Sequence, residues 1–172
     1  SRGLGDVYKR QIQYVTMLIK SYIILGDIYT TKENLFMFQV FVDSAANLPA
    51  VTAKKYDIHV VSFVNLVNGK ELVCFDPDLS PEEELAKGKE YYNAMRTGCE
   101  IKTGLISTAN FADAFRTALE ADQDVIYLSL SKNISGTYNS ARLAAEELLE
   151  EYGGKRKIRL VDSLNASLAQ GI

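Results

Sequence analysis

The sequence predicts an α/β fold, with a mainly parallel sheet flanked by helices and a β-hairpin insertion. Strand-like and helix-like segments alternate from residue 107 onward, which is typical of β-α-β units. The strand-like runs 37–43 and 124–131 are largely apolar, as in strands that are buried on both faces. Asn68-Gly69 separates two further strand-like runs and is typical of a two-residue hairpin turn.

The first half of the domain contains the predicted hairpin. After the strand at 37–43, Pro49 opens a short helix. One long strand is predicted over 58–67, and it pairs across the Asn68-Gly69 turn with residues 70–75. An antiparallel piece is therefore expected next to the parallel sheet.

Two helices follow the hairpin. In the first, over 78–98, Ser80 is the cap, Pro81 takes the first helical position and Glu83 completes a capping box. The second, over 107–124, begins with a serine cap. Its predicted buried face consists of Phe111, Phe115, Ala118 and Leu119.

The last predicted elements are a strand at 124–131, a helix at 136–154 and a strand at 157–163. Gly153-Gly154 stands where a helix C-cap is favoured. The residues in register on the helix are Tyr138, Leu143, Ala144 and Leu148. A further segment begins before Ile172, and we interpret the end there as a truncation.

Residues 1–36 are interpreted separately from the domain at 37–172. Residues 1–11 have no apolar period and are typical of a non-native extension. Residues 12–29 are hydrophobic, but Lys20 interrupts them and leaves too few apolar residues for a membrane span. They are either a short element packed on the domain or non-native upstream sequence, and we expect the natural protein to start at Met37.

Composition excludes several classes of function. The formal net charge is −3 and no basic block is present, so we expect no nucleic-acid partner. Because the apolar pieces of residues 12–29 are too short for a membrane span, we also expect no stable membrane insertion. Cys74 and Cys99 lack a C-x-x-C spacing and a paired histidine, which argues against zinc or a disulfide and favours a reducing cytosol, hence a cytoplasmic protein. His59 is interpreted as a strand residue with a local hydrogen bond, not as a catalytic base.

Three predicted strands end in small polar residues: Asp43-Ser44, Ser129 to Ser131, and Asp162-Ser163. The carboxyl ends of neighbouring parallel strands lie along one edge, where ligands bind. If the three strands are neighbours, these side chains face one site. The alternative is that they only cap the following helices.

The Ser135-Gly136-Thr137 step offers hydroxyls and free N–H groups at a helix N-terminus, which suits a carboxylate or a phosphate. The Walker, nucleophile-elbow and dinucleotide-binding motifs are all absent, so a hydrolase or a nucleotide-dependent dehydrogenase is poorly supported. Thr103, next to Gly104 in the loop 100–111, can turn back toward the same sheet edge.

Together these motifs resemble the DegV family of bacterial fatty-acid-binding proteins. The resemblance runs from about Met37 to the end of the chain and is carried, in the order of the family, by "FVDSAANLP" (41–49), "DPDLSPEEE" (76–84), "IKTGLIS" (101–107), "SKNISGTYNSARLAAE" (131–146) and "VDSLNASLAQG" (161–171). The most specific element is the run I-S-G-T-Y-x-S-A.

The resemblance implies a two-domain protein that buries an acyl chain and presents its carboxylate to a partner fatty-acid kinase for acyl-phosphate formation. This chain would then be the N-terminal domain of a lipid-binding carrier subunit, not an enzyme, with no cofactor. By motif, Thr103 and Ser135 would bind the carboxylate of the fatty acid, with the N–H of Gly136 close by. The residues that would line the same edge are Asp43, Ser44 and Ser131.

The chain departs from the pattern of the family in three respects. Val42 stands where the family usually has threonine, and "KTGLIS" stands where it has K-T-S-Q-P-S. The second domain of the family is absent from the sequence. Two other interpretations stay open: a small α/β enzyme that binds a phosphorylated metabolite at the Ser-Gly-Thr step, and a domain whose hydroxyls are only helix caps.

Overall fold

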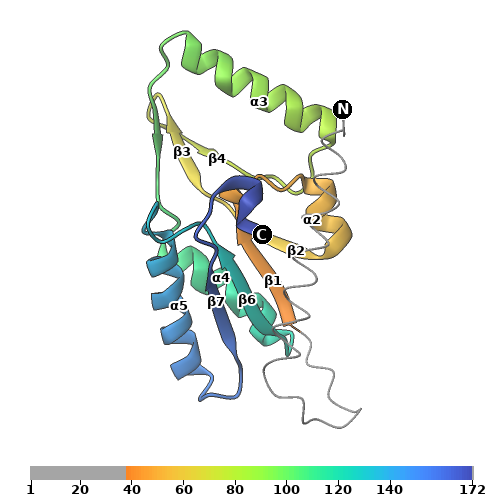
Figure 1. The fold of residues 1–172 in the computed structure, drawn as a ribbon, viewed down its shortest axis with the longest axis vertical. Coiled ribbons are helices and arrows are strands. Elements are labelled where there is room, and N and C mark those ends of the chain that lie inside the picture. Colours follow the sequence, from red (N-terminus) through yellow and green to blue (C-terminus); the bar gives the residue numbers. More distant parts are fainter. Residues whose placement is uncertain (1–37, 172) are drawn as a thin grey trace.

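The computed structural model describes residues 38–171 (Figure 1). The interpretations of residues 1–36, and of Met37 as the start of the first strand, fall outside the described residues. The larger sheet has four strands in the order β2-β1-β6-β7. These strands are β1 (Phe38–Asp43), β2 (Ile58–Val61), β6 (Asp124–Ser129) and β7 (Ile158–Asp162). All three neighbouring pairs are parallel, which confirms the predicted fold class.

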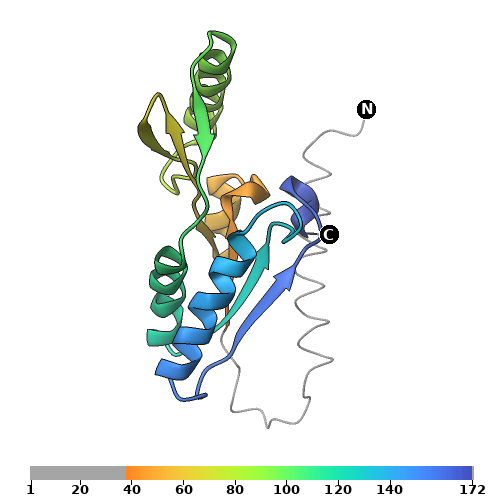
Figure 2. The ribbon, with the colours of Figure 1, turned by 90° about the vertical axis from the view of Figure 1, so that its left-hand side faces the viewer.

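Two long helices lie together on one face of this sheet, as the side view shows: α4 (Thr108–Glu120) and α5 (Thr137–Glu151) (Figure 2). The main core lies between them and the strands, and its largest fully buried side chains are Tyr127, Phe41, Phe111 and Phe115. On β6, Val125 and Tyr127 are fully buried, whereas Ile126 and Leu128 are half-buried. The prediction that this strand is buried on both faces is therefore correct for one face only.

The buried face predicted from the sequence is correct for α4 and only partly correct for α5. All four residues predicted for α4 are buried. On α5, Ala144 and Leu148 are buried as predicted, but Tyr138 is only half-buried and Leu143 is 39% exposed. The buried residues of α5 are Thr137, Ala141, Ala144, Ala145 and Leu148. Small residues make up most of this face because α5 packs directly against α4.

The run 58–67 is two strands and not one, which corrects the sequence prediction. β2 ends at Val61 in the parallel sheet, and β3 (Val64–Val67) belongs to a second sheet. Two serine hydroxyls satisfy backbone groups at the break, because Ser44 Oγ accepts from the N–H of Phe63 at 2.9 Å and Ser62 Oγ accepts from the N–H of Phe75 at 2.9 Å. The chain passes from the first sheet to the second at the point where these serine hydroxyls, and not a neighbouring strand, bind the backbone N–H groups.

The second sheet is small and antiparallel, in the order β4-β3-β5. It contains β3, β4 (Lys70–Val73) and β5 (Ile101–Thr103). Asn68 and Gly69 have φ values of 49° and 77°, as the predicted hairpin turn requires. β5 was predicted as loop, since a strand of three residues leaves almost no periodic signal.

Four further helical segments complete the described chain. The predicted capping box is present at the start of α3 (Pro81–Arg96), which stands at the far end of the molecule from α4 and α5 (Figure 1). The short α2 (Ala50–Tyr56) begins after Pro49 and packs against β2. Two 3-10 turns, η1 (Ser44–Ala46) and η2 (Ser167–Gly171), contact each other beyond the strand ends.

Candidate functional site

The three polar strand ends lie side by side, as the sequence analysis required for a shared site. β6 lies between β1 and β7, with Val42 opposite Leu128 and Ser129 opposite Asp162. Because all three strands are parallel, their carboxyl ends share one edge of the sheet. That edge leads into η1, the loop before α5, and η2.

Asp43, at the end of β1, has no exposed surface and is held by four donors from the chain. Its Oδ2 accepts hydrogen bonds from the Tyr127 hydroxyl at 2.7 Å, the N–H of Leu130 at 2.8 Å and the Gln170 side-chain amide at 3.1 Å. Its Oδ1 accepts from the N–H of Ala45 at 3.1 Å. This carboxylate joins β1, β6, η1 and η2, and both of its oxygens are occupied within the protein. That Asp43 lines a ligand site stays a prediction.

Tyr127 is the buried partner of Asp43. Burial raises the pKa of its hydroxyl above the ordinary value for tyrosine, and the negative charge of Asp43 raises this pKa further. The neutral phenol therefore stays protonated and donates its hydrogen to the carboxylate.

We expect Tyr127→Phe to change how stability depends on alkaline pH. The contribution of a tyrosine with a raised folded-state pKa is fully present below the unfolded-state value of about 10 and is lost as the pH rises above it. The wild-type chain should therefore lose free energy of unfolding above about pH 10, and the variant should lose less. Urea unfolding between neutral and alkaline pH measures this. Equal slopes for the two proteins would contradict the assignment, and Tyr92→Phe, at an exposed tyrosine, is the control.

Ser44 and Ser131 also have structural contacts. Ser44 is half-buried and its hydroxyl holds the break between β2 and β3. Ser131 is 2% exposed, and its carbonyl accepts from the N–H groups of Ile134 and Ser135 at 2.9 and 3.1 Å. Its Oγ accepts from the N–H of Asn133 at 3.3 Å. Ser131 thus shapes the loop before α5, and its role in lining the site stays a prediction.

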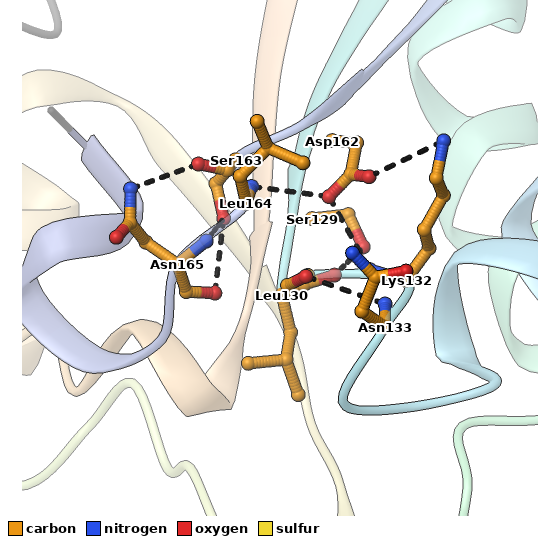
Figure 3. A network of polar contacts seen from close by, with 9 residues as sticks. Ser129, Leu130, Lys132, Asn133, Asp162, Ser163, Leu164 and Asn165 are labelled. Atoms are coloured by element: carbon orange, nitrogen blue, oxygen red, sulfur yellow. Dashed lines mark hydrogen bonds and ion pairs between the residues drawn. The ribbon is translucent and has the colours of Figure 1, made fainter.

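The loops after β6 and β7 are tied together by Asp162 (Figure 3). Its Oδ1 accepts from the N–H groups of Lys132 at 3.2 Å and Leu164 at 3.1 Å. The Lys132 ammonium lies 3.6 Å from Oδ2 and is 59% exposed. The N–H of Ser131 donates to the carbonyl of Asn165, which adds a further link between the loops. The loop that carries Ser135 is therefore fixed to β7 as well as to β6.

The start of α5 has the features of an anion site. Ser135 Oγ accepts from the N–H of Thr137 at 3.2 Å and lies 2.9 Å from the Thr137 hydroxyl. When the fully buried Thr137 hydroxyl donates in this pair, the Ser135 hydroxyl hydrogen is free to donate to a ligand. Within residues 38–171, the N–H groups of Gly136 and Tyr138 have no acceptor. These donors lie at the positive end of a 15-residue helix.

The Thr103 segment reaches this helix start. Thr103 ends β5 and is exposed, and the N–H of Gly104 donates to the carbonyl of Val64 at 2.9 Å. Leu105 then lies against Gly136, with its Cδ1 3.4 Å from the position that a Cβ on Gly136 would take. The structure therefore brings the predicted Thr103 segment and the Ser135-Gly136 step together, with Leu105 as the point of contact.

Sequence reasoning missed Tyr127, Gln170 and Leu105. Tyr127 and Gln170 bind Asp43 from 84 and 127 residues away in the chain, so no local spacing identifies them. Leu105 stands beside another apolar residue, Ile106, and nothing in the sequence sets it apart before its partner, Gly136, is known. His59 is exposed on β2, where its ring meets Phe41 edge-on with centroids 5.1 Å apart.

Other kinds of site find no support in the part of the chain that the structure describes. No group of three His, Cys, Asp or Glu side chains within residues 38–171 is placed to hold a metal ion. None of the described helices is both long enough and apolar enough to cross a membrane. Both cysteines, Cys74 and Cys99, are free.

Comparisons with known proteins support the resemblance seen in the sequence. A family model described as "Uncharacterised protein, DegV family" matches residues 37–172. A DegV domain-containing protein of Clostridium perfringens is 35% identical over 136 residues, covering 78% of this chain and 44% of that protein. The chain thus spans less than half the length of this curated relative.

Solved structures with the same fold include fatty-acid-binding proteins. A stearic-acid-binding protein from Eubacterium ventriosum superposes with a TM-score of 0.66 at 26% identity, covering 78% of this chain and 44% of that one. A Thermotoga maritima protein with a fatty-acid-binding function superposes with a TM-score of 0.63 at 31% identity, covering 77% and 45%. The family model covers the whole described domain, and the chain therefore belongs to the DegV family.

Proposed function

We propose that the protein of which this domain is part binds a long-chain fatty acid, with the carboxylate at the N-terminus of α5. The observation that carries the proposal is the contact between the Thr103 segment and the Ser135-Gly136 step. There the exposed Leu105 lies against Gly136, whose N–H has no acceptor within residues 38–171. The family relationship supports the choice of ligand, because solved relatives bind fatty acids. The Thr103 and Ser135 hydroxyls and the N–H of Gly136 donate to the carboxylate in this proposal.

The chemistry of the neighbourhood favours an acid with an apolar tail. Three donors suit a carboxylate or a phosphate equally. Leu105, 61% exposed, and Ile134, 64% exposed, flank those donors, however, and a sugar phosphate offers nothing to cover them. The alkyl chain of a fatty acid removes this surface from water, with each buried CH₂ contributing about 0.8 kcal/mol.

We further propose that the whole protein acts as a carrier in the cytoplasm, without a cofactor of its own, and presents the carboxylate to a partner fatty-acid kinase. Thr103 and Gly136 are exposed, so the head-group end of the site is accessible to a partner. Formation of an acyl phosphate when the loaded protein is mixed with a fatty-acid kinase and ATP, trapped by hydroxylamine, tests this step. If the kinase formed acyl phosphate no faster from the loaded protein than from free fatty acid, the proposal would be contradicted.

The ligand itself is tested with the whole protein that contains this domain, because the chain spans only 44% of its curated relative. Palmitate is expected to raise its melting temperature, and denaturing mass spectrometry of the purified protein should release a long-chain acid. Methyl palmitate, which lacks the carboxylate, and glucose 6-phosphate, which lacks the tail, should have no effect. Stabilisation by glucose 6-phosphate but not by palmitate would overturn the proposal in favour of an enzyme that binds a phosphorylated metabolite.

A further inference from the structure

We propose that Leu105 is a specificity-determining residue, which selects acids whose carbons next to the carboxylate carry no polar substituent. This inference rests on the proposed function and goes beyond it, because it concerns which carboxylic acids the site accepts. It assigns the selection to one side chain at the contact between the Thr103 segment and the start of α5.

Two glycines hold Leu105 at the start of α5. A Cβ on Gly104 would come within 3.1 Å of the carbonyl oxygen of Val64, so glycine lets the end of β5 approach β3. The two methyl groups of Leu105 lie 3.4 and 3.9 Å from the place of a Cβ on Gly136. The leucine therefore packs over the backbone whose N–H group is a proposed carboxylate donor.

Leu105 remains 61% exposed despite this contact. One side of the isobutyl group packs on Gly136, and the other is in contact with water. A carboxylate bound to the N–H of Gly136 places its second and third carbons within reach of the same side chain. When these two carbons are methylene groups, they cover Leu105, and the apolar surfaces of the acid and of the leucine are both removed from water.

A hydroxyl group on the second carbon meets a different environment. Leucine offers no hydrogen-bond partner, so a hydroxyl turned toward it loses its water without compensation. Leu105 therefore favours an unsubstituted acid over its 2-hydroxy counterpart. The carboxylate donors bind the two acids alike. Glutamine has a similar length and carries an amide, so Leu105→Gln removes this discrimination with little change in size.

The test compares the affinities for palmitate and 2-hydroxypalmitate in three forms of the whole protein that contains this domain: wild type, Leu105→Gln and Leu85→Gln. Leu85 lies on α3 and is 60% exposed, so the control makes the same change at equal exposure away from the site. We expect the preference for palmitate to fall about tenfold in Leu105→Gln, because the glutamine amide offers a hydrogen-bond partner to the 2-hydroxyl that leucine leaves without one. Leu85→Gln should keep the wild-type ratio.

The outcomes separate this inference from the proposed function. Tight palmitate binding with an unchanged ratio in Leu105→Gln would overturn the role of Leu105 and leave fatty-acid binding intact. Absence of palmitate binding to the whole protein that contains this domain would overturn both. Thermal melting followed by circular dichroism should show equal stability for the three proteins, since both leucines are exposed.

Discussion

Asp43→Ala is expected to lower the free energy of unfolding by about 4 kcal/mol, because buried donors that lose a charged acceptor pay their full desolvation cost. The carboxylate has no exposed surface and receives hydrogen bonds from Ala45, Tyr127, Leu130 and Gln170. Removing it leaves all four donors without their partner at the junction of β1, β6 and η2. Urea-induced unfolding measures the loss.

Two variants accompany this measurement. Asp43→Asn keeps one acceptor oxygen but turns an N–H₂ group toward donors, so its loss should be intermediate. Asp78→Ala removes an aspartate whose side chain is 86% exposed and whose partner, Lys54, is also on the surface, and it should change stability by less than about 1 kcal/mol. If Asp43→Ala lowered the free energy of unfolding by no more than Asp78→Ala does, the buried network would not be what holds the strand ends together.

The second large effect is on binding. The combined substitution Thr103→Val and Ser135→Ala is expected to weaken palmitate binding at least about a hundredfold, since each hydrogen bond to a charged group contributes roughly 1.5–3 kcal/mol. Fluorescence competition with a fatty-acid probe measures the change. Ser135→Ala also removes the acceptor of the Thr137 N–H, so a stability loss of about 1 kcal/mol should accompany it.

A matched pair separates binding from capping. Ser80→Ala with Thr97→Val makes the same two changes at the ends of α3, where Ser80 is a helix cap and Thr97 binds helix carbonyls. This control should lose comparable stability and keep its affinity for palmitate. If the Thr103 and Ser135 variant also keeps its affinity, the two hydroxyls are structural and the proposed head-group site is wrong.

Much of the fold could be predicted from local patterns. The capping box at Ser80, the turn at Asn68-Gly69 and the apolar face of α4 depend on residues within a few positions of one another. Such short-range signals survive in a single sequence. The break at Ser62-Phe63 was missed because its cause, the Ser44 hydroxyl, lies 19 residues away.

The candidate site, like the fold, was predictable only where its signals are local in the sequence. By itself, the sequence determined that three polar strand ends exist, that a Ser-Gly-Thr step opens a helix, and that parallel strands would bring such ends to one edge. Only the tertiary structure decided their separate roles. Asp43 is turned inward because Tyr127 and Gln170 reach it from distant parts of the chain. Ser135, in contrast, is only half-buried, and Gly136 is exposed beside Leu105. The physical reason is that burial and hydrogen-bond pairing depend on contacts between residues far apart in the chain, which the short-range pattern around each residue does not record.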